Sequence, residues 1–67
     1  MLTRREEVRR VIENMGRNMK LGEVATLEVS EDVVEYAVDE AIRCGLSVID
    51  AYEKDSTIVL TIEKRFK

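Results

Sequence analysis

Carboxylates are the only abundant side chains in this sequence that could do chemistry, and three of them share a face of one predicted helix. Asp32, Glu35 and Asp39 follow one another at spacings of three and four residues, which aligns them in a row on a helix. A calcium or magnesium ion needs six or more oxygens that converge at short range. Side chains on an exposed helix face diverge instead. The row therefore predicts a solvated acidic face without a metal or other cofactor.

Catalysis by a nucleophile and a base finds little support in the rest of the chain. The sequence has 67 residues with no histidine and one cysteine, so it lacks the commonest general base near neutral pH. Cys44 follows a predicted helix, and the negative end of the helix dipole disfavours a reactive thiolate there. Gly16, Gly22 and Gly45 are isolated and form no phosphate-binding loop. We therefore expect Cys44 to pack in the core and the protein not to be an enzyme.

Basic residues concentrate at the two ends of the chain. Residues 1–20 carry six Lys or Arg against three Glu, whereas residues 21–53 carry nine carboxylates against Arg43. Guanidinium groups can hold phosphate oxygens in pairs, and Phe66 among cations could stack on a base. The candidate nucleic-acid-binding residues are Arg4, Arg5, Arg9, Arg10, Arg17, Lys64, Arg65 and Lys67.

The same residues also fit an ordinary solvated helix. Arg10 can pair with Glu6 and Glu13, and Arg9 can pair with Glu13, each about one turn away. A formal net charge of -3 opposes the approach of a polyanion.

The first helix is predicted from a capping box at Thr3–Glu6 and from an apolar stripe of period 3.6. Gly16 could end this helix near Met15, but Met19 continues the stripe and favours a longer helix capped at Gly22. The stripe consists of Val8, Val11, Ile12, Met15 and Met19.

A strand, a second helix and a hairpin follow. Apolar and polar residues alternate over Ala25–Val29, Ser30 suits a helix N-cap, and Gly45 suits the end of that helix. Its stripe is Val34, Ala37, Val38, Ala41 and Ile42. Leu46–Tyr52 and Thr57–Ile62 are rich in strand-forming residues and should pair antiparallel.

The register of this hairpin depends on the loop length. A two-residue loop at Lys54 and Asp55 places Ile49 and Ala51 on one face with Ile58 and Leu60. Val48 and Val59 then occupy the opposite face, and a three-residue loop exchanges the two sets. The sequence leaves both registers open.

These elements predict one domain over residues 1–67 in the order α-β-α-β-β, with a crossover through the second helix. The fold class is α+β, a two-layer sandwich with two helices on one face of a small three-stranded mixed sheet. A domain of this size buries only roughly 60% of its unfolded surface. One cysteine and no histidine rule out an internal disulfide and a typical zinc site. We therefore expect a homodimer.

The composition also predicts the surroundings of the protein. A lone cysteine and the lack of an apolar leader suggest the reducing cytoplasm. No apolar run approaches the roughly 20 residues that a membrane helix needs. High charge, no glutamine and two asparagines resemble proteins from hot environments and suggest a thermophilic source.

Two short motifs stand out: Ala37–Asp39 reads Ala-Val-Asp in the predicted second helix, and Ser56–Ile58 reads Ser-Thr-Ile at the start of the last predicted strand. With these motifs and this order of elements, the segment from Val8 to Lys64 looks like the Alba family of small archaeal chromatin and RNA-binding proteins. The resemblance implies a dimer that binds duplex DNA or RNA through basic residues. The chain lacks the family's first strand and long hairpin arm, and Glu28–Asp32 is acidic where the family is basic. No nucleic-acid contact transfers by match.

Two functions from different classes follow. The first is a non-enzymatic binding module that acts through protein-protein interaction, by its sheet edge, its apolar sheet face or its acidic second helix. The alternative is an Alba-like nucleic-acid-binding protein that uses the basic first helix and C-terminal tail.

Overall fold

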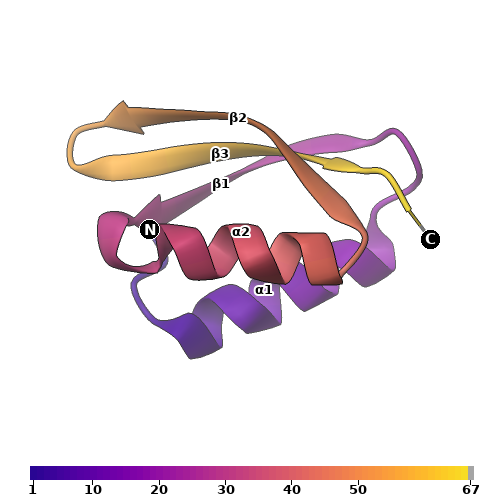
Figure 1. Cartoon of the computed structure of the whole chain (residues 1–67), viewed down its shortest axis with the longest axis horizontal. Coiled ribbons are helices and arrows are strands. Elements are labelled where there is room, and N and C mark those ends of the chain that lie inside the picture. The colour runs from indigo at the N-terminus through magenta and orange to yellow at the C-terminus, as the bar shows by residue number, and fades with distance from the viewer. Residues whose placement is uncertain (67) are drawn as a thin grey trace.

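Two helices lie against one face of a three-stranded sheet (Figure 1). This computed structural model describes residues 1–66. The elements are α1 (Arg5–Asn18), β1 (Val24–Ser30), a short 3-10 helix (Glu31–Val33), α2 (Val34–Arg43), β2 (Leu46–Lys54) and β3 (Thr57–Lys64). The predicted α+β class, the order of elements and the placement of both helices on one face are confirmed.

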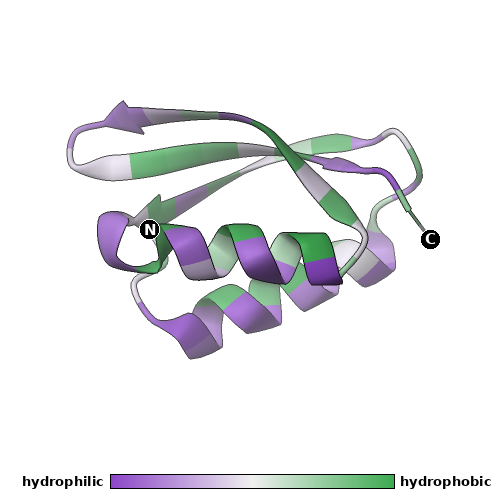
Figure 2. Cartoon of the chain, viewed as in Figure 1, coloured by the Kyte–Doolittle hydropathy of each residue, from purple (hydrophilic) through white to green (hydrophobic). Residues whose placement is uncertain are grey.

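The sheet has the order β1-β3-β2, and both neighbouring pairs are antiparallel. The sheet was expected to be mixed, which requires at least one parallel pair of neighbouring strands, but β1-β3 and β3-β2 are both antiparallel. β1 and β2 do run in the same direction, but the hairpin returns β3 between them and separates them. β3 is accordingly the central strand, and Figure 2 shows a long hydrophobic stretch on it.

The core lies between the sheet and the helices. Leu60 and Ile62 of β3 are fully buried there, as are Val8 and Ile12 of α1. Val59 is 5% exposed yet lies outside this core, on the opposite face of the sheet. That face, which we call the open face, faces away from both helices. The core residues are Val8, Ile12, Leu27, Val29, Val33, Ala37, Ala41, Leu46, Leu60 and Ile62.

The start of α1 differs from the expected capping box. The N-cap is Arg4, without a side-chain hydrogen bond, and Thr3 lies outside the helix. The reason is Leu2, whose amide donates to the carbonyl of Glu28 and whose carbonyl accepts from the amide of Ser30, at 2.9 and 2.8 Å. These bonds hold residues 1–3 in an extended path beside β1, so the helix begins later.

α1 continues through Gly16 and ends at Asn18, short of the predicted cap at Gly22. Gly16 packs tightly against the residue that follows α2, since a Cβ atom there would stand 2.9 Å from the carbonyl oxygen of Cys44. The glycine that weakens the helix by propensity thus permits its packing on α2.

The turn of the hairpin is one residue later than predicted. Lys54 pairs with Thr57, and the loop is Asp55 and Ser56, both with positive φ (50° and 67°). Positive φ at both positions is the signature of a type I′ turn.

A β-bulge in β2 then decides which apolar residues face the core. Ala51 pairs with Leu60, as the two-residue loop requires, but the register shifts between Val48 and Asp50. Val48 therefore packs against the core, and Ile49 is left 46% exposed outside it. Neither register left open by the sequence holds along the whole strand, because a bulge adds one residue between Val48 and Asp50.

Candidate interaction surfaces

Lys64, one of the predicted phosphate contacts, is buried. Its side chain enters the layer between sheet and helices, and Nζ donates to the carbonyl oxygen of Gly16 at 2.5 Å. Gly16 is among the last residues of α1, whose final carbonyls have no partner within the helix. The ammonium group of Lys64 thus caps α1 from inside the fold and does not reach the surface.

Three more of the predicted basic residues have partners within the chain. The guanidinium carbon of Arg5 lies 5.4 Å from the centre of the Tyr36 ring, a cation-π contact between α1 and α2. Arg10 pairs with Glu6 at 3.4 Å, and Arg65 pairs with Glu63 at 3.1 Å. The Arg10–Glu6 ion pair is one of those that the sequence suggested as an alternative to phosphate binding.

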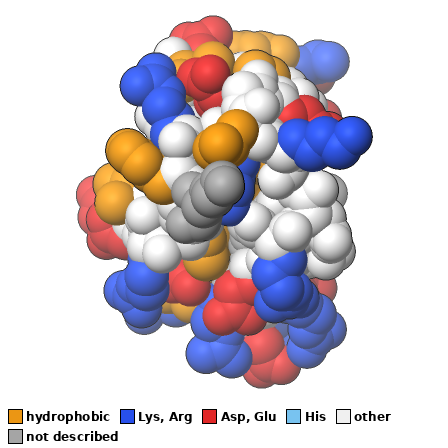
Figure 3. Space-filling view, turned by 90° about the vertical axis from the view of Figure 1, so that its right-hand side faces the viewer, with side chains coloured by type: hydrophobic (Ala, Val, Ile, Leu, Met, Phe, Trp, Pro, Cys, Tyr) orange, Lys and Arg blue, Asp and Glu red, His pale blue; other side chains and the backbone are white. Residues whose placement is uncertain are grey.

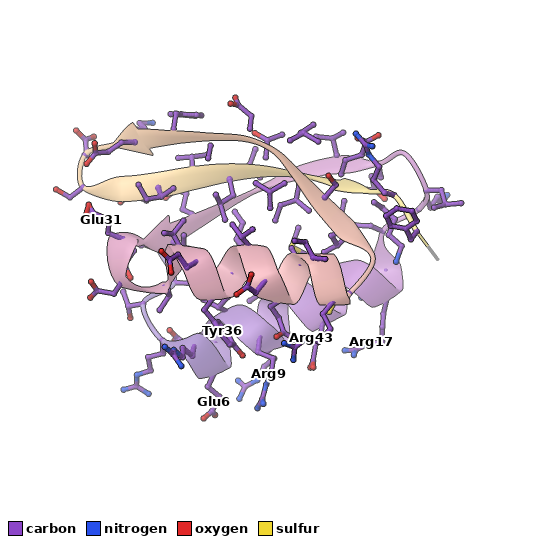
Figure 4. All side chains as sticks on the ribbon, viewed as in Figure 1. Glu6, Arg9, Arg17, Glu31, Tyr36 and Arg43 are labelled. Atoms are coloured by element: carbon purple, nitrogen blue, oxygen red, sulfur yellow. The ribbon has the colours of Figure 1, made fainter. Side chains whose placement is uncertain are left out.

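Arg4, Arg9 and Arg17 are exposed and have no ion-pair partner among residues 1–66. Arg9 and Arg17 project from α1 away from the sheet (Figure 4). In Figure 3, acidic side chains are interspersed with the basic ones over the lower part of the molecule, where α1 lies. On the face that this figure shows, the basic side chains therefore do not form one continuous cationic surface. Lys67 lies outside the described residues.

A hollow of about 470 Å³ lies at the C-terminal end of α1, lined by Gly16, Arg17, Met19, Lys20, Leu21 and Lys64. Three cations border it, but so does the negative end of the α1 dipole. Lys64 donates to a carbonyl of that end. The ammonium group of Lys64 is therefore engaged by a helix carbonyl and is not free to bind a ligand.

Cys44 is half-buried directly after α2. Burial raises the pKa of its thiol, and the nearby carboxylates of Glu40 and Glu13 raise this pKa further. A raised pKa leaves little thiolate near neutral pH, which agrees with the packing role expected for Cys44.

The outer side of α2 carries an apolar stripe that no other part of the chain covers completely. Tyr36 and Cys44 face α1, and Ala37 and Ala41 are fully buried. On the side turned away from α1, Val34 and Val38 are half-buried and Ile42 is 64% exposed. The predicted core position of Ile42 was therefore wrong.

A groove of about 280 Å³ follows the first half of this stripe. It is lined by Val34, Glu35, Val38 and Asp39, so its floor is apolar and its rim is acidic. The row of Asp32, Glu35 and Asp39 is exposed, as predicted. Across residues 1–66, no three or more Cys, Asp or Glu side chains come together as metal ligands.

The two edges of the sheet differ. Leu2 bonds to the end of β1, so part of that edge is covered. On the other side, no segment of residues 1–66 pairs with the outer edge of β2, and residues 49–54 are all exposed. α2 packs against β2, so the groove lies below this free edge. We call the free edge of β2 and the α2 groove together the β2 side.

The signals for these surfaces were only partly visible in the sequence. The acidic face and a free sheet edge were predicted, but the groove was not, because Val34 and Val38 look like core residues by period. No known family model matches the chain, and no characterised protein or solved structure gave a match. No helix in the described part of the chain is long and apolar enough to cross a membrane.

Proposed function

We propose that this chain is a non-enzymatic protein-interaction module that works as a homodimer, with the β2 side as its interface. The observation that carries the proposal is that a free strand edge and an uncovered apolar groove lie on the same side of the molecule. Unpaired strand edges are templates for pairing with another chain. Apolar grooves gain stability when a second surface excludes water from them.

The exposed surface of the chain is also large enough for an interface with a second copy. A standard interface buries roughly 800 Å² per partner. The described chain exposes 4552 Å², so a dimer would cover about a sixth of it. The core consists of small and medium aliphatic residues with no aromatic ring. Burial of further apolar surface in a dimer would offset the marginal stability of so small a domain.

Sedimentation equilibrium between about 1 and 200 μM tests the proposal, because it yields the mass directly. We expect twice the mass of one chain at the upper end of this range. Val38→Lys should weaken the dimer, since it places an ammonium group in the groove, while Glu35, three residues earlier, supports the helix by pairing with that group. Asn14→Lys, on the exposed face of α1, is the matched control. A monomer at every concentration would refute the proposed function.

Nucleic-acid binding is the second candidate, and the three unpaired arginines on the surface favour it: Arg4, Arg9 and Arg17. It predicts an affinity for duplex DNA or RNA that falls steeply between ~50 and ~200 mM salt. Fluorescence anisotropy of labelled duplexes measures this, with Arg9→Ala and Arg17→Ala as weakening variants. Lys64→Ala is not a useful test, because it would disturb the cap on α1.

A further inference from the structure

We propose that two copies pair edge to edge through β2, antiparallel, about a two-fold axis that passes through Tyr52. The two three-stranded sheets would then form one continuous sheet of six strands. The inference rests on the proposed homodimer and goes further, since it names the strand and the register that join the copies.

The regular part of the free edge is symmetric about Tyr52. The bulge lies between Val48 and Asp50, and the turn begins at Asp55. Only Asp50–Lys54 is therefore both regular and free to pair, and Tyr52 is its middle residue. A two-fold axis at Tyr52 uses every residue of this segment and leaves the bulge outside the new ladder.

The backbone supports the same centre. The amide of Ala51 donates to the carboxylate of Asp50, its own neighbour, at 2.9 Å. An amide bonded in this way is not a donor to β3, so it faces the free edge. Backbone groups two residues apart face the same edge of a strand, so Glu53 faces outward too. Rotation about Tyr52 places Ala51 opposite the partner's Glu53. In the dimer the Ala51 amide exchanges the Asp50 carboxylate for the carbonyl of the partner's Glu53, so outward donors meet outward acceptors on both strands.

The side chains on the open face are complementary in the same register. Asp50, Tyr52 and Lys54 pair with Thr61, Val59 and Thr57 of β3, so all three lie on one face. The two-fold axis sets Asp50 opposite the partner's Lys54 and the two tyrosines opposite each other. These are non-hydrogen-bonded positions, where opposing side chains come closest. Each dimer thus gains two ion pairs and one tyrosine pair.

Neighbouring registers lack this match. A centre at Ala51 brings the bulge at Ile49 into the ladder and places Asp50 opposite the partner's Tyr52. A centre at Glu53 sets the two Glu53 carboxylates directly opposite each other, which is unfavourable. A two-fold axis midway between two neighbouring residues would place a residue whose backbone groups face the free edge opposite one whose backbone groups face β3. Tyr52 is the centre that satisfies backbone and charge together.

The α2 groove lies where the partner would cover it. Ser30 and Lys54 both pair with Thr57, so α2, which follows Ser30 by a short 3-10 helix, begins at the turn end of the sheet. In this register the partner's Asp50 lies beside the turn end of β2. A two-fold axis normal to the sheet keeps both helical layers on one face, so the partner's α2 approaches the groove that contains Val34 and Val38. Edge pairing and groove burial thus occur in one dimer.

Disulfide trapping at the axis tests the register. Opposing residues at a non-hydrogen-bonded position have Cα atoms about 4.5 Å apart, within the range for a disulfide. Tyr52→Cys, in a Cys44→Ser background that sediments like the original chain, should form a covalent dimer under mild oxidation. Thr61→Cys is the matched control, because it lies on the open face of β3 and both β2 strands separate it from its counterpart. It should stay uncrosslinked.

A charge exchange provides the second test. Asp50→Lys alone and Lys54→Asp alone each set like charges opposite each other, and each should weaken the dimer about tenfold. The double variant restores the opposite charges and should recover most of the loss. A Tyr52→Cys chain that is dimeric but does not crosslink, or single variants without effect, would overturn the register. The homodimer would still stand in that case, whereas a monomeric original chain would remove both proposals.

Discussion

The ammonium group of Lys64 lies inside the protein because a carbonyl at the end of α1 accepts a hydrogen bond from it. Hydrogen bonds that involve a charged group contribute about 1.5–3 kcal/mol, and the positive charge also suits the negative end of the helix dipole. Lys64 is only 7% exposed, and its Nζ reaches the carbonyl oxygen of Gly16. Lys64, which the charge pattern assigns to a basic tail, therefore stabilises the fold.

We expect Lys64→Met to lower the free energy of unfolding by about 1–3 kcal/mol, because it leaves the carbonyl of Gly16 without its donor while it preserves the stem. Urea denaturation measures the loss. Lys20→Met is the control, since Lys20 borders the same hollow but is exposed, and it should change stability by less than about 0.5 kcal/mol. Equal losses in the two variants would contradict the capping role.

The thiol of Cys44 should react slowly at neutral pH. Its pKa is raised by burial first and then by the carboxylates of Glu40 and Glu13, so the thiolate fraction is smaller than in a free cysteine. The rate of reaction with an aromatic disulfide should therefore keep rising at pH values beyond the usual thiol range. A rate that reaches its plateau below that range would contradict the raised pKa.

The same shift has a consequence for stability. In the unfolded chain the thiol ionises at its ordinary pKa, below the raised pKa of the folded state. The contribution of Cys44 to stability is therefore complete below the ordinary pKa and is lost as the pH rises through the folded pKa. Cys44→Ser should remove this part of the pH dependence, which thermal unfolding on both sides of the thiol range would detect.

Among the elements, the hairpin turn is the place where one substitution should make the protein more stable. Asp55 and Ser56 both have positive φ, which non-glycine residues adopt at a cost. Ser56→Gly removes that cost at the second position and should raise stability by about 0.5–1 kcal/mol. In a domain of this size, that is a rise of about 4 °C in Tm by calorimetry. Ser56→Val, with a β-branched residue at the same angle, should lower Tm, and the opposite order would contradict the type I′ turn.

The helices and strands could be predicted because their signals are local. The period of Val8, Ile12 and Met15 indicates α1 without knowledge of its partner, and alternation indicates β1 in the same way. The bulge at Ile49 has no such signal, since the residue before it and the residue after it are both compatible with a regular strand. One inserted residue then exchanged Val48 and Ile49 between the core and the surface.

At the scale of the whole molecule, contacts between distant segments determine the strand order and the burial of Lys64, which local sequence patterns do not predict. The central place of β3 depends on its pairing with β1 along its whole length, and Lys64 meets Gly16 across 48 residues of sequence. Both contacts alter the candidate surfaces. The first leaves β2 at a free edge, and the second removes a cation from the tail. Charge along the chain predicted an acidic middle and basic ends but not which side of the molecule is left uncovered.

The stability of the protein should depend on its concentration. In a homodimer each unfolding event also separates two chains, so a tenfold rise in concentration adds about 1.4 kcal/mol to the free energy of unfolding per mole of dimer. Thermal unfolding of the original chain from about 2 to 200 μM should therefore show Tm rising steadily. Val38→Lys should show a lower Tm that varies less over the same range, because the groove no longer binds the partner. A constant Tm for the original chain would mean that the small core is sufficient alone and that the β2 side has no need of a second copy.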